Sequence, residues 1–177
     1  MRSCRHAPRS AAGFTATELI IVLAIAGIVA AVAVPGWMRA RAARNEAAAV
    51  ASVRRILAAE IAYAAACGRE GYATGLVTLG TPPPGGAQPF LEQDLAAPEP
   101  VMDGYRFALR PGAYAKAGPD DCHGRPTQTA FYVSAVPESP GSSGGYAFAA
   151  NTGSNVWQVR GASPPTEPFL PPAAPVR

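Results

Sequence analysis

Apolar residues dominate one continuous stretch near the start of the chain. Residues 19–34 are apolar or glycine without a break, and Phe14 and Met38 extend the apolar character on either side. At about 1.5 Å per residue, a helix over residues 14–38 could cross a hydrocarbon layer of about 30 Å. The charge in this stretch is Glu18, near its start, and a carboxylate in lipid is costly unless a partner offsets it. The pattern predicts a membrane-spanning helix.

Beyond Pro35 the sequence takes on the pattern of an amphipathic helix. Apolar residues recur every three or four positions, namely at Ala43, Ala47, Val50, Leu57, Ile61 and Ala64, with Val53 beside them. Such steps mark one face of a helix. We therefore expect a single helix that continues to about Cys67 and ends at Gly68. Pro35 lies inside it and cannot donate to the carbonyl of Ala31, which predicts a kink.

Residues 68–102 are predicted to form a loop, because glycine and proline punctuate them throughout. A short helical turn is compatible with residues 90–95. The residues expected to pin this loop onto the helix are Tyr72, Leu76, Val77 and Leu79.

The remaining part of the chain predicts a small antiparallel sheet. Four stretches with a period of about two predict strands, at residues 105–109, 129–136, 145–149 and 155–160. The sequence Asn-Thr-Gly-Ser between the last two is typical of a turn, so these strands should form a hairpin. After Gly161 prolines recur, and we expect residues 162–177 to be an extended, mobile tail. The predicted fold class is α+β, with the long N-terminal helix packed on the sheet.

The start of the apolar stretch carries a specific motif. Its members are Gly13, Phe14, Thr15, Glu18, Ala24, Gly27 and Pro35, preceded by a short basic leader. This order, Gly-Phe-Thr-x-x-Glu before a long apolar run, resembles the N-terminal signature of type IV pilins and pseudopilins. Ala16 and Thr17 depart from the family pattern, in which larger aliphatic residues are usual. An ordinary signal anchor or a cleaved secretory signal is the competing interpretation.

The resemblance implies a division of the chain and a sequence of processing steps. Residues 1–13 would be a leader that a prepilin peptidase removes after Gly13, followed by N-methylation of Phe14. Residues 14–38 would hold the precursor in the inner membrane with its head in the periplasm, and later drive assembly. Glu18 would then pair with the new amino group of an adjacent subunit, and Pro35 would lie in a part of the helix that loses order in the fibre. Residues 39–67 would be the amphipathic half of the helix and residues 68–161 the head.

The function implied is that of a structural subunit of a type IV pilus-like fibre, with homo- or hetero-oligomeric partners. Two alternatives stay open at this point. One is a pseudopilin of a type II secretion system, which acts as a piston. The other is a minor tip pilin whose head binds DNA or a surface.

The cysteines and the charge refine this picture. Cys4 would leave with the leader, whereas Cys67 and Cys122 would remain in a domain that faces an oxidising compartment, which favours a disulfide over two free thiols. Three of the 15 basic residues also lie in the leader, so a processed chain would carry 12 basic and 12 acidic residues. The basic isoelectric point therefore gives no argument for nucleic-acid binding.

No catalytic constellation stands out in the sequence. It contains no nucleophile elbow, no glycine-rich phosphate loop and no cluster with metal-ligand spacing. His123 is the one histidine beyond the leader. Asp120 and Asp121 are interpreted as a solvated turn rather than a calcium loop, because calcium needs several ordered oxygens. We expect no enzymatic activity, no cofactor and no metal.

Overall fold

The long N-terminal helix is the main element of the computed structural model, which describes residues 13–176. Helix α1 (Ala16–Ala66) runs for 51 residues and passes through Pro35 without ending. It ends where the N–H groups of Cys67 and Gly68 both donate to the carbonyl of Tyr63. The prediction of one helix reaching Cys67 is confirmed. By its internal contacts the chain divides into two compact units, the first ending at Met38 and the second starting at Arg39.

The second unit contains a six-stranded antiparallel sheet whose strands follow one another in chain order. The strands are β1 (Val101–Met102), β2 (Tyr105–Pro111), β3 (Phe131–Pro137), β4 (Tyr146–Asn151), β5 (Val156–Arg160) and β6 (Ala174–Pro175). The four predicted strands are confirmed to within two residues at each end. The two short strands were not predicted, because two residues carry no recognisable period.

The predicted hairpin between β4 and β5 is confirmed. Ala150 lies opposite Val156, and the turn closes through a hydrogen bond from Ser154 N to the carbonyl of Asn151 at 3.0 Å. The side chain of Asn151 also accepts from Gly153 N at 2.9 Å. An asparagine that bonds its own backbone two residues on is a local turn device.

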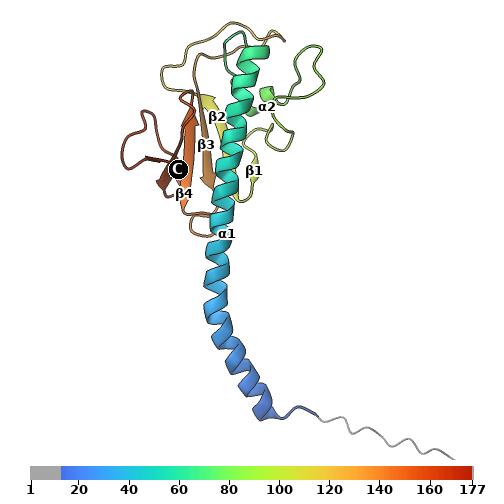
Figure 1. Cartoon of the computed structure of the whole chain (residues 1–177), viewed down its shortest axis with the longest axis vertical. Coiled ribbons are helices and arrows are strands. Elements are labelled where there is room, and N and C mark those ends of the chain that lie inside the picture. The colour runs from blue at the N-terminus through green and yellow to red at the C-terminus, as the bar shows by residue number, and fades with distance from the viewer. Residues whose placement is uncertain (1–12, 177) are drawn as a thin grey trace, which may run out of the picture. The chain divides into compact units, whose positions relative to one another are not determined.

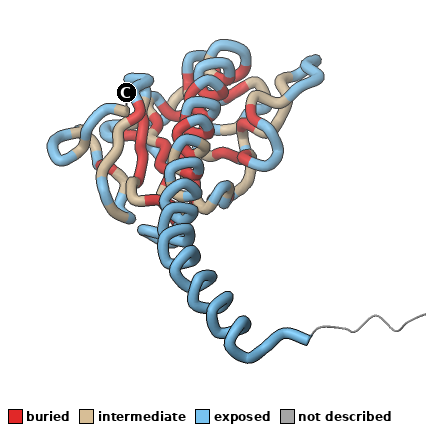
Figure 2. The backbone as a smooth tube through the Cα atoms, turned by 60° about the horizontal axis from the view of Figure 1, so that its bottom comes forward, coloured by how far each residue is buried: buried red, intermediate tan, exposed pale blue. Residues whose placement is uncertain are grey.

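The head-packed segment of α1, residues 39–66, lies across one face of this sheet (Figure 1). The buried residues gather on this segment and on the strands facing it (Figure 2). From the sheet, Phe107, Val133 and Phe148 are buried to 2% exposure or less. Near the N-terminal end of this segment, two side chains bind the connection between β3 and β4. Asn45 Nδ2 donates to Ser143 O, and Glu46 Oε1 accepts from Gly145 N.

The buried face of the helix differs from the predicted one. Val50, Val53 and Leu57 are buried as expected, but the predicted positions Ala43, Ala47 and Ile61 are exposed. The true face is rotated and includes Ile56, Glu60 and Tyr63 instead. A carboxylate in the middle of the buried face interrupts the apolar pattern, so the periodicity indicated a neighbouring face.

The loop from residue 68 contains one short helix, α2 (Leu76–Leu79). Leu76 and Leu79 are buried as predicted, whereas Val77 is 53% exposed. The turn expected near residues 90–95 is present, since the N–H groups of Leu95 and Ala96 both donate to the carbonyl of Glu92.

The expectation of a mobile C-terminal tail is wrong. Strand β6 pairs with β5, and the ring of Phe169 stacks on Trp157 and Tyr132 at centroid distances of 5.3 and 6.3 Å. By strand alternation these two residues point from the sheet face opposite the helix. Glu167 also accepts hydrogen bonds from Ala113 N and from the Asn151 side chain. The tail is ordered because its one aromatic ring, Phe169, packs on the rings of Tyr132 and Trp157.

Candidate functional site

The predicted processing residues lie just before helix α1. Gly13 and Phe14 precede its first residue, Ala16, and Phe14 is 82% exposed. A side chain built at Gly13 would meet nothing within 4 Å. The backbone is therefore accessible at this point, as a protease would require. The rest of the predicted leader, including Cys4, lies outside the described residues.

Glu18 has a partner within its own chain that sequence reasoning overlooked. Its Oε2 atom accepts hydrogen bonds from Thr15 N at 3.0 Å and from Thr15 Oγ1 at 2.9 Å, and Glu18 N donates to Thr15 Oγ1 at 3.2 Å. This reciprocal pair is a capping box, in which two otherwise unpaired N–H groups at the start of a helix are satisfied. The sequence Thr-x-x-Glu was visible as its signature.

The following segment of α1 is apolar on all sides. Residues 13–41 are all exposed, and the large apolar side chains among them range from 45% to 82% exposed. They are Phe14, Leu19, Ile20, Ile21, Val22, Leu23, Ile25, Ile28, Val29, Val32, Val34, Trp37 and Met38. The helix is long and apolar enough to span a membrane. A surface of this kind needs lipid or protein around it.

Pro35 lies in this apolar segment. It is followed directly by Gly36, and the helical assignment continues through both. Because proline has no N–H, the carbonyl of Ala31 is left without its usual donor. The missing hydrogen bond is the reason for predicting a kink here, and the helix continues past Pro35.

The predicted disulfide is confirmed. Cys67 and Cys122 are bonded, with their Cα atoms 4.8 Å apart, and Cys122 N donates to the carbonyl of Cys67 at 2.8 Å. The bond ties the end of α1 to the segment between β2 and β3. A ring nitrogen of His123 lies within 4.8 Å of both sulfurs. The disulfide consumes the two thiolates that a metal would need, so this trio is not a metal site in the oxidised protein.

Asp121, next to the disulfide, is not part of a solvated turn as expected. It is buried and accepts hydrogen bonds from Tyr63 Oη at 2.8 Å, from His123 N and Arg125 N, and from Arg125 Nε at 3.0 Å. Burial alone would raise the pKa of Asp121, but these donors lower it to about 2. The carboxylate organises the loop around itself and joins it to α1 through Tyr63.

Glu60 is a second buried carboxyl group, which the periodicity of the helix did not indicate. The side chain is fully buried, and its Oε2 atom accepts from Ala73 N at 2.9 Å. Burial raises the pKa of Glu60 to about 8, against the opposing effect of the hydrogen bond from Ala73. On a helix rich in charged residues, a glutamate is expected to face solvent.

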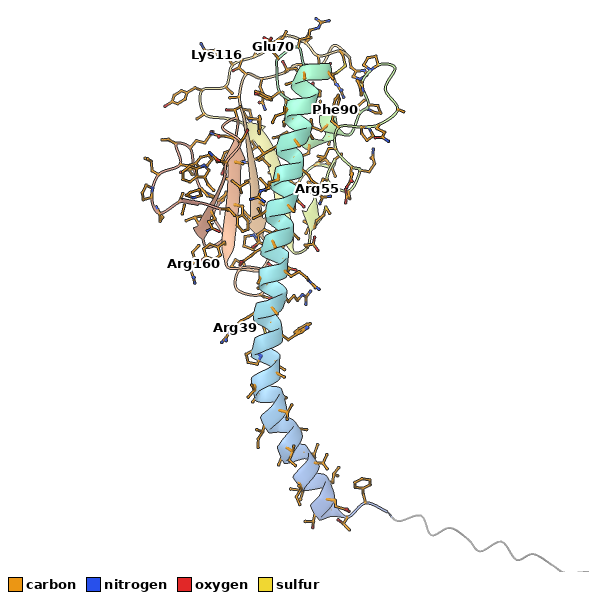
Figure 3. The ribbon with its side chains drawn as sticks, viewed as in Figure 1. Arg39, Arg55, Glu70, Phe90, Lys116 and Arg160 are labelled. Atoms are coloured by element: carbon orange, nitrogen blue, oxygen red, sulfur yellow. A yellow bond between two sulfur atoms is a disulfide. The ribbon has the colours of Figure 1, made fainter. Side chains whose placement is uncertain are left out.

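A shallow groove of about 350 Å³ runs beside α1. Arg55 on the helix and Phe90 on the adjoining loop border it (Figure 3), and Ala58, Ala62 and Leu91 line it. Arg55 is paired with Glu92 at 3.0 Å. The lining contains no serine, cysteine or histidine, and Glu92, its one carboxylate, is the group paired with Arg55.

Comparison of the chain with protein-family models, with curated proteins and with solved structures finds no match. The function is therefore inferred from the residues and their geometry. Two regions are relevant to function. They are the N-terminal segment around Glu18 and the junction between α1 and the loops at the disulfide.

Proposed function

We propose that this chain is the precursor of a structural subunit of a type IV pilus-like fibre, cut after Gly13 and assembled through residues 14–38. One observation carries the proposal. A single helix begins just after Gly13-Phe14 with an exposed segment that is apolar from Leu19 to Val34, and it continues into a segment whose face forms part of the core of the head. A helix built in this way joins the head to an apolar segment, and lipid or other helices must cover the surface of that segment.

The apolar segment would have two environments in succession. In the precursor it would lie in the inner membrane, with the head on the periplasmic side, where an oxidising environment preserves the Cys67–Cys122 disulfide. On leaving the membrane it would have to bury its side chains against the same segment of neighbouring subunits. Each large apolar side chain that is buried contributes about 1.5–3 kcal/mol relative to exposure. That contribution is relative to water, so packing against neighbours spares the extracted segment exposure to water. Relative to lipid, the gain comes from close helix packing and from pairing of polar groups.

Glu18 is suited to set the register of that packing. Both bonds from Thr15 use its Oε2 atom, and Oε1 accepts no hydrogen bond from residues 13–176. A carboxylate can accept several hydrogen bonds. The capping box can therefore persist while Oε1 pairs with the ammonium group of Phe14 in an adjacent subunit. Pairing removes the cost of burying either charge alone.

The test is to express the full-length chain in a host that has a prepilin peptidase and a pilus assembly system. Intact-mass analysis of the membrane fraction should find a chain that starts at methylated Phe14, and shearing the cells should release it as fibres. A chain that starts downstream, near Ala33 or Trp37, would show a secretory signal and overturn the proposal. A chain that is processed at Phe14 but found only in short periplasmic rods would assign the subunit to a secretion pseudopilus.

A further inference from the structure

Two buried side chains form hydrogen bonds with the backbone of Ala73, one with its N–H group and the other with its carbonyl. Glu60 Oε2 accepts from Ala73 N at 2.9 Å, and Gln128 Nε2 donates to the carbonyl of Ala73 at 2.7 Å. The backbone of Gln128 also pairs with that of Tyr72 in both directions, at 2.8 and 3.0 Å. Helix α1, the loop after it and the segment before β3 therefore meet at this residue.

Each of the two side chains has one atom left without a partner. Glu60 Oε1 and Gln128 Oε1 are buried and accept no hydrogen bond from the described residues. The residues are 0% and 4% exposed, so neither oxygen lies at the surface. Unsatisfied polar atoms at such depth are rare in native proteins and need an explanation.

We propose that Glu60 is protonated in the folded head and that its Oε1–H donates to Gln128 Oε1, which closes a proton-dependent clasp around Ala73. An ionised carboxylate only accepts hydrogen bonds, and the amide oxygen of glutamine also only accepts. A protonated carboxyl group supplies one donor. A single proton therefore satisfies both unpaired atoms.

The other titratable and charged groups near Glu60 do not donate a hydrogen bond to its Oε1 atom. The titratable and charged groups nearby are Tyr63 on α1 and Asp121 and Arg125 in the segment between β2 and β3. The Tyr63 hydroxyl donates to Asp121, and Arg125 donates to Asp121 and to Thr81. Arg125 Nη2 is itself buried without a partner, so it does not bond Glu60 Oε1. Among residues 13–176, no ion pair involves Glu60, and the pKa of its carboxyl group responds only to burial and to the bond from Ala73.

The clasp makes the end of α1 sensitive to pH. Burial raises the pKa of Glu60 from 4.5 to about 8, so the folded head binds this proton more tightly than the unfolded chain does. Its contribution to stability is complete below pH 4.5 and falls as the pH rises toward about 8. Above that pH, a carboxylate would face the carbonyl oxygen of Gln128, and the loops would loosen from the helix. The device is independent of whether the chain forms fibres.

Glu60→Gln provides the test, because an amide keeps an acceptor for Ala73 N and supplies a permanent donor to Gln128. The full-length protein in detergent micelles is unfolded thermally at several pH values and followed by near-UV circular dichroism. The wild-type midpoint should fall by about 10 °C between about pH 5 and about pH 9. The Glu60→Gln midpoint should stay flat over the same range. Glu92→Gln, which changes an exposed carboxylate, is the matched control and should keep the wild-type slope.

A second measurement applies even if Glu60→Gln fails to fold. Infrared spectra of the wild type in heavy water at neutral pH should contain the band of a buried protonated carboxyl group, which disappears above about pH 8. A wild-type spectrum without this band at neutral pH would overturn the proposal. A pH slope that is unchanged in a folded Glu60→Gln variant would overturn it as well.

Discussion

Helix α1 carries a carboxyl group in each of two contrasting regions. In the apolar segment, residues 14–38, Glu18 is exposed and finds its donors three residues away, on Thr15. In the head-packed segment, residues 39–66, Glu60 is fully buried and its donor is Ala73, beyond the end of the helix. The comparison shows that one continuous helix satisfies its polar groups by local rules in one region and by tertiary contacts in the other.

The two regions also differ in what stabilises them. The head-packed segment already buries Val53, Ile56 and Tyr63 completely against the sheet and loops. In the apolar segment no residue is buried. Substitutions in the head-packed segment should therefore change the stability of the head. Substitutions in the apolar segment should change assembly and leave the head folded. The predictions below test that separation.

The largest expected effect is on assembly when the charge of Glu18 is removed. Glu18→Gln keeps the capping box, because glutamine also caps at this position. In the proposed fibre it would leave the Phe14 ammonium of a neighbour unpaired. A buried charge without its partner costs about 3–5 kcal/mol in each subunit. We expect normal cleavage and membrane insertion with loss of sheared fibres, for Glu18→Ala as well as for Glu18→Gln.

Thr15→Ala is the matched control for the Glu18 variants. It removes the capping hydroxyl, at a cost of about 1 kcal/mol, and keeps the charge. Fibres should persist in this variant. If Glu18→Ala assembles as well as the wild type while the wild type forms fibres, charge pairing is wrong and apolar packing alone sets the register.

The largest effect on the head should come from the disulfide. Replacing Cys67 and Cys122 by alanine opens a loop with a sequence separation of 55 residues. The chain-entropy estimate for closing such a loop is roughly 4 kcal/mol. Denaturant unfolding monitored by the fluorescence of Trp157 should show this loss, and non-reducing peptide mapping should find the bridge in the wild type. Two alkylatable thiols in periplasmic wild-type protein would contradict the prediction.

An intermediate effect is expected for Tyr63→Phe. The substitution keeps the edge-to-face contact with Phe90 at 5.5 Å but removes the hydroxyl that donates to Asp121 at 2.8 Å. A hydrogen bond to a charged group contributes about 1.5–3 kcal/mol. The pKa of Asp121 should also rise from about 2, since one of the donors that lower it is gone. Unfolding at low pH should therefore begin at a higher pH than in the wild type.

Tyr72→Phe serves as the control for that substitution. The ring of Tyr72 also packs edge-to-face, on Phe131 at 4.8 Å, but its hydroxyl makes no hydrogen bond within the described part of the chain. Its unfolding midpoint should stay close to that of the wild type. Equal losses for the two tyrosines would show that the hydroxyl of Tyr63 contributes nothing beyond its ring.

The smallest expected effect is on the sheet face opposite the helix. Phe169→Ala removes the ring that stacks on Trp157, and aromatic pairs contribute about 1 kcal/mol beyond their burial. The emission of Trp157 should shift to longer wavelength as water reaches it. Leu170→Ala, at a neighbouring position that is 64% exposed, should leave the spectrum unchanged. An unshifted spectrum in Phe169→Ala would show that the tail does not cover this face.

Local patterns in the sequence were sufficient for much of this protein. The unbroken apolar run, the continuous helix to Cys67 and the four longer strands all follow from periodicities that neighbouring residues express among themselves. The pairing of Cys67 with Cys122 followed from a count of two cysteines in an oxidising setting. Even the Thr15–Glu18 capping box was readable, because both partners lie within one helical turn.

Tertiary structure alone decided the burial of Glu60, the role of Asp121 and the order of the tail. Each depends on residues distant in the chain, such as Ala73 for Glu60, Tyr63 for Asp121 and Trp157 for Phe169. A side chain's environment is set by whatever the fold brings against it. A glutamate or an aspartate in a helical or turn pattern looks the same in sequence whether solvent or a buried donor will satisfy it.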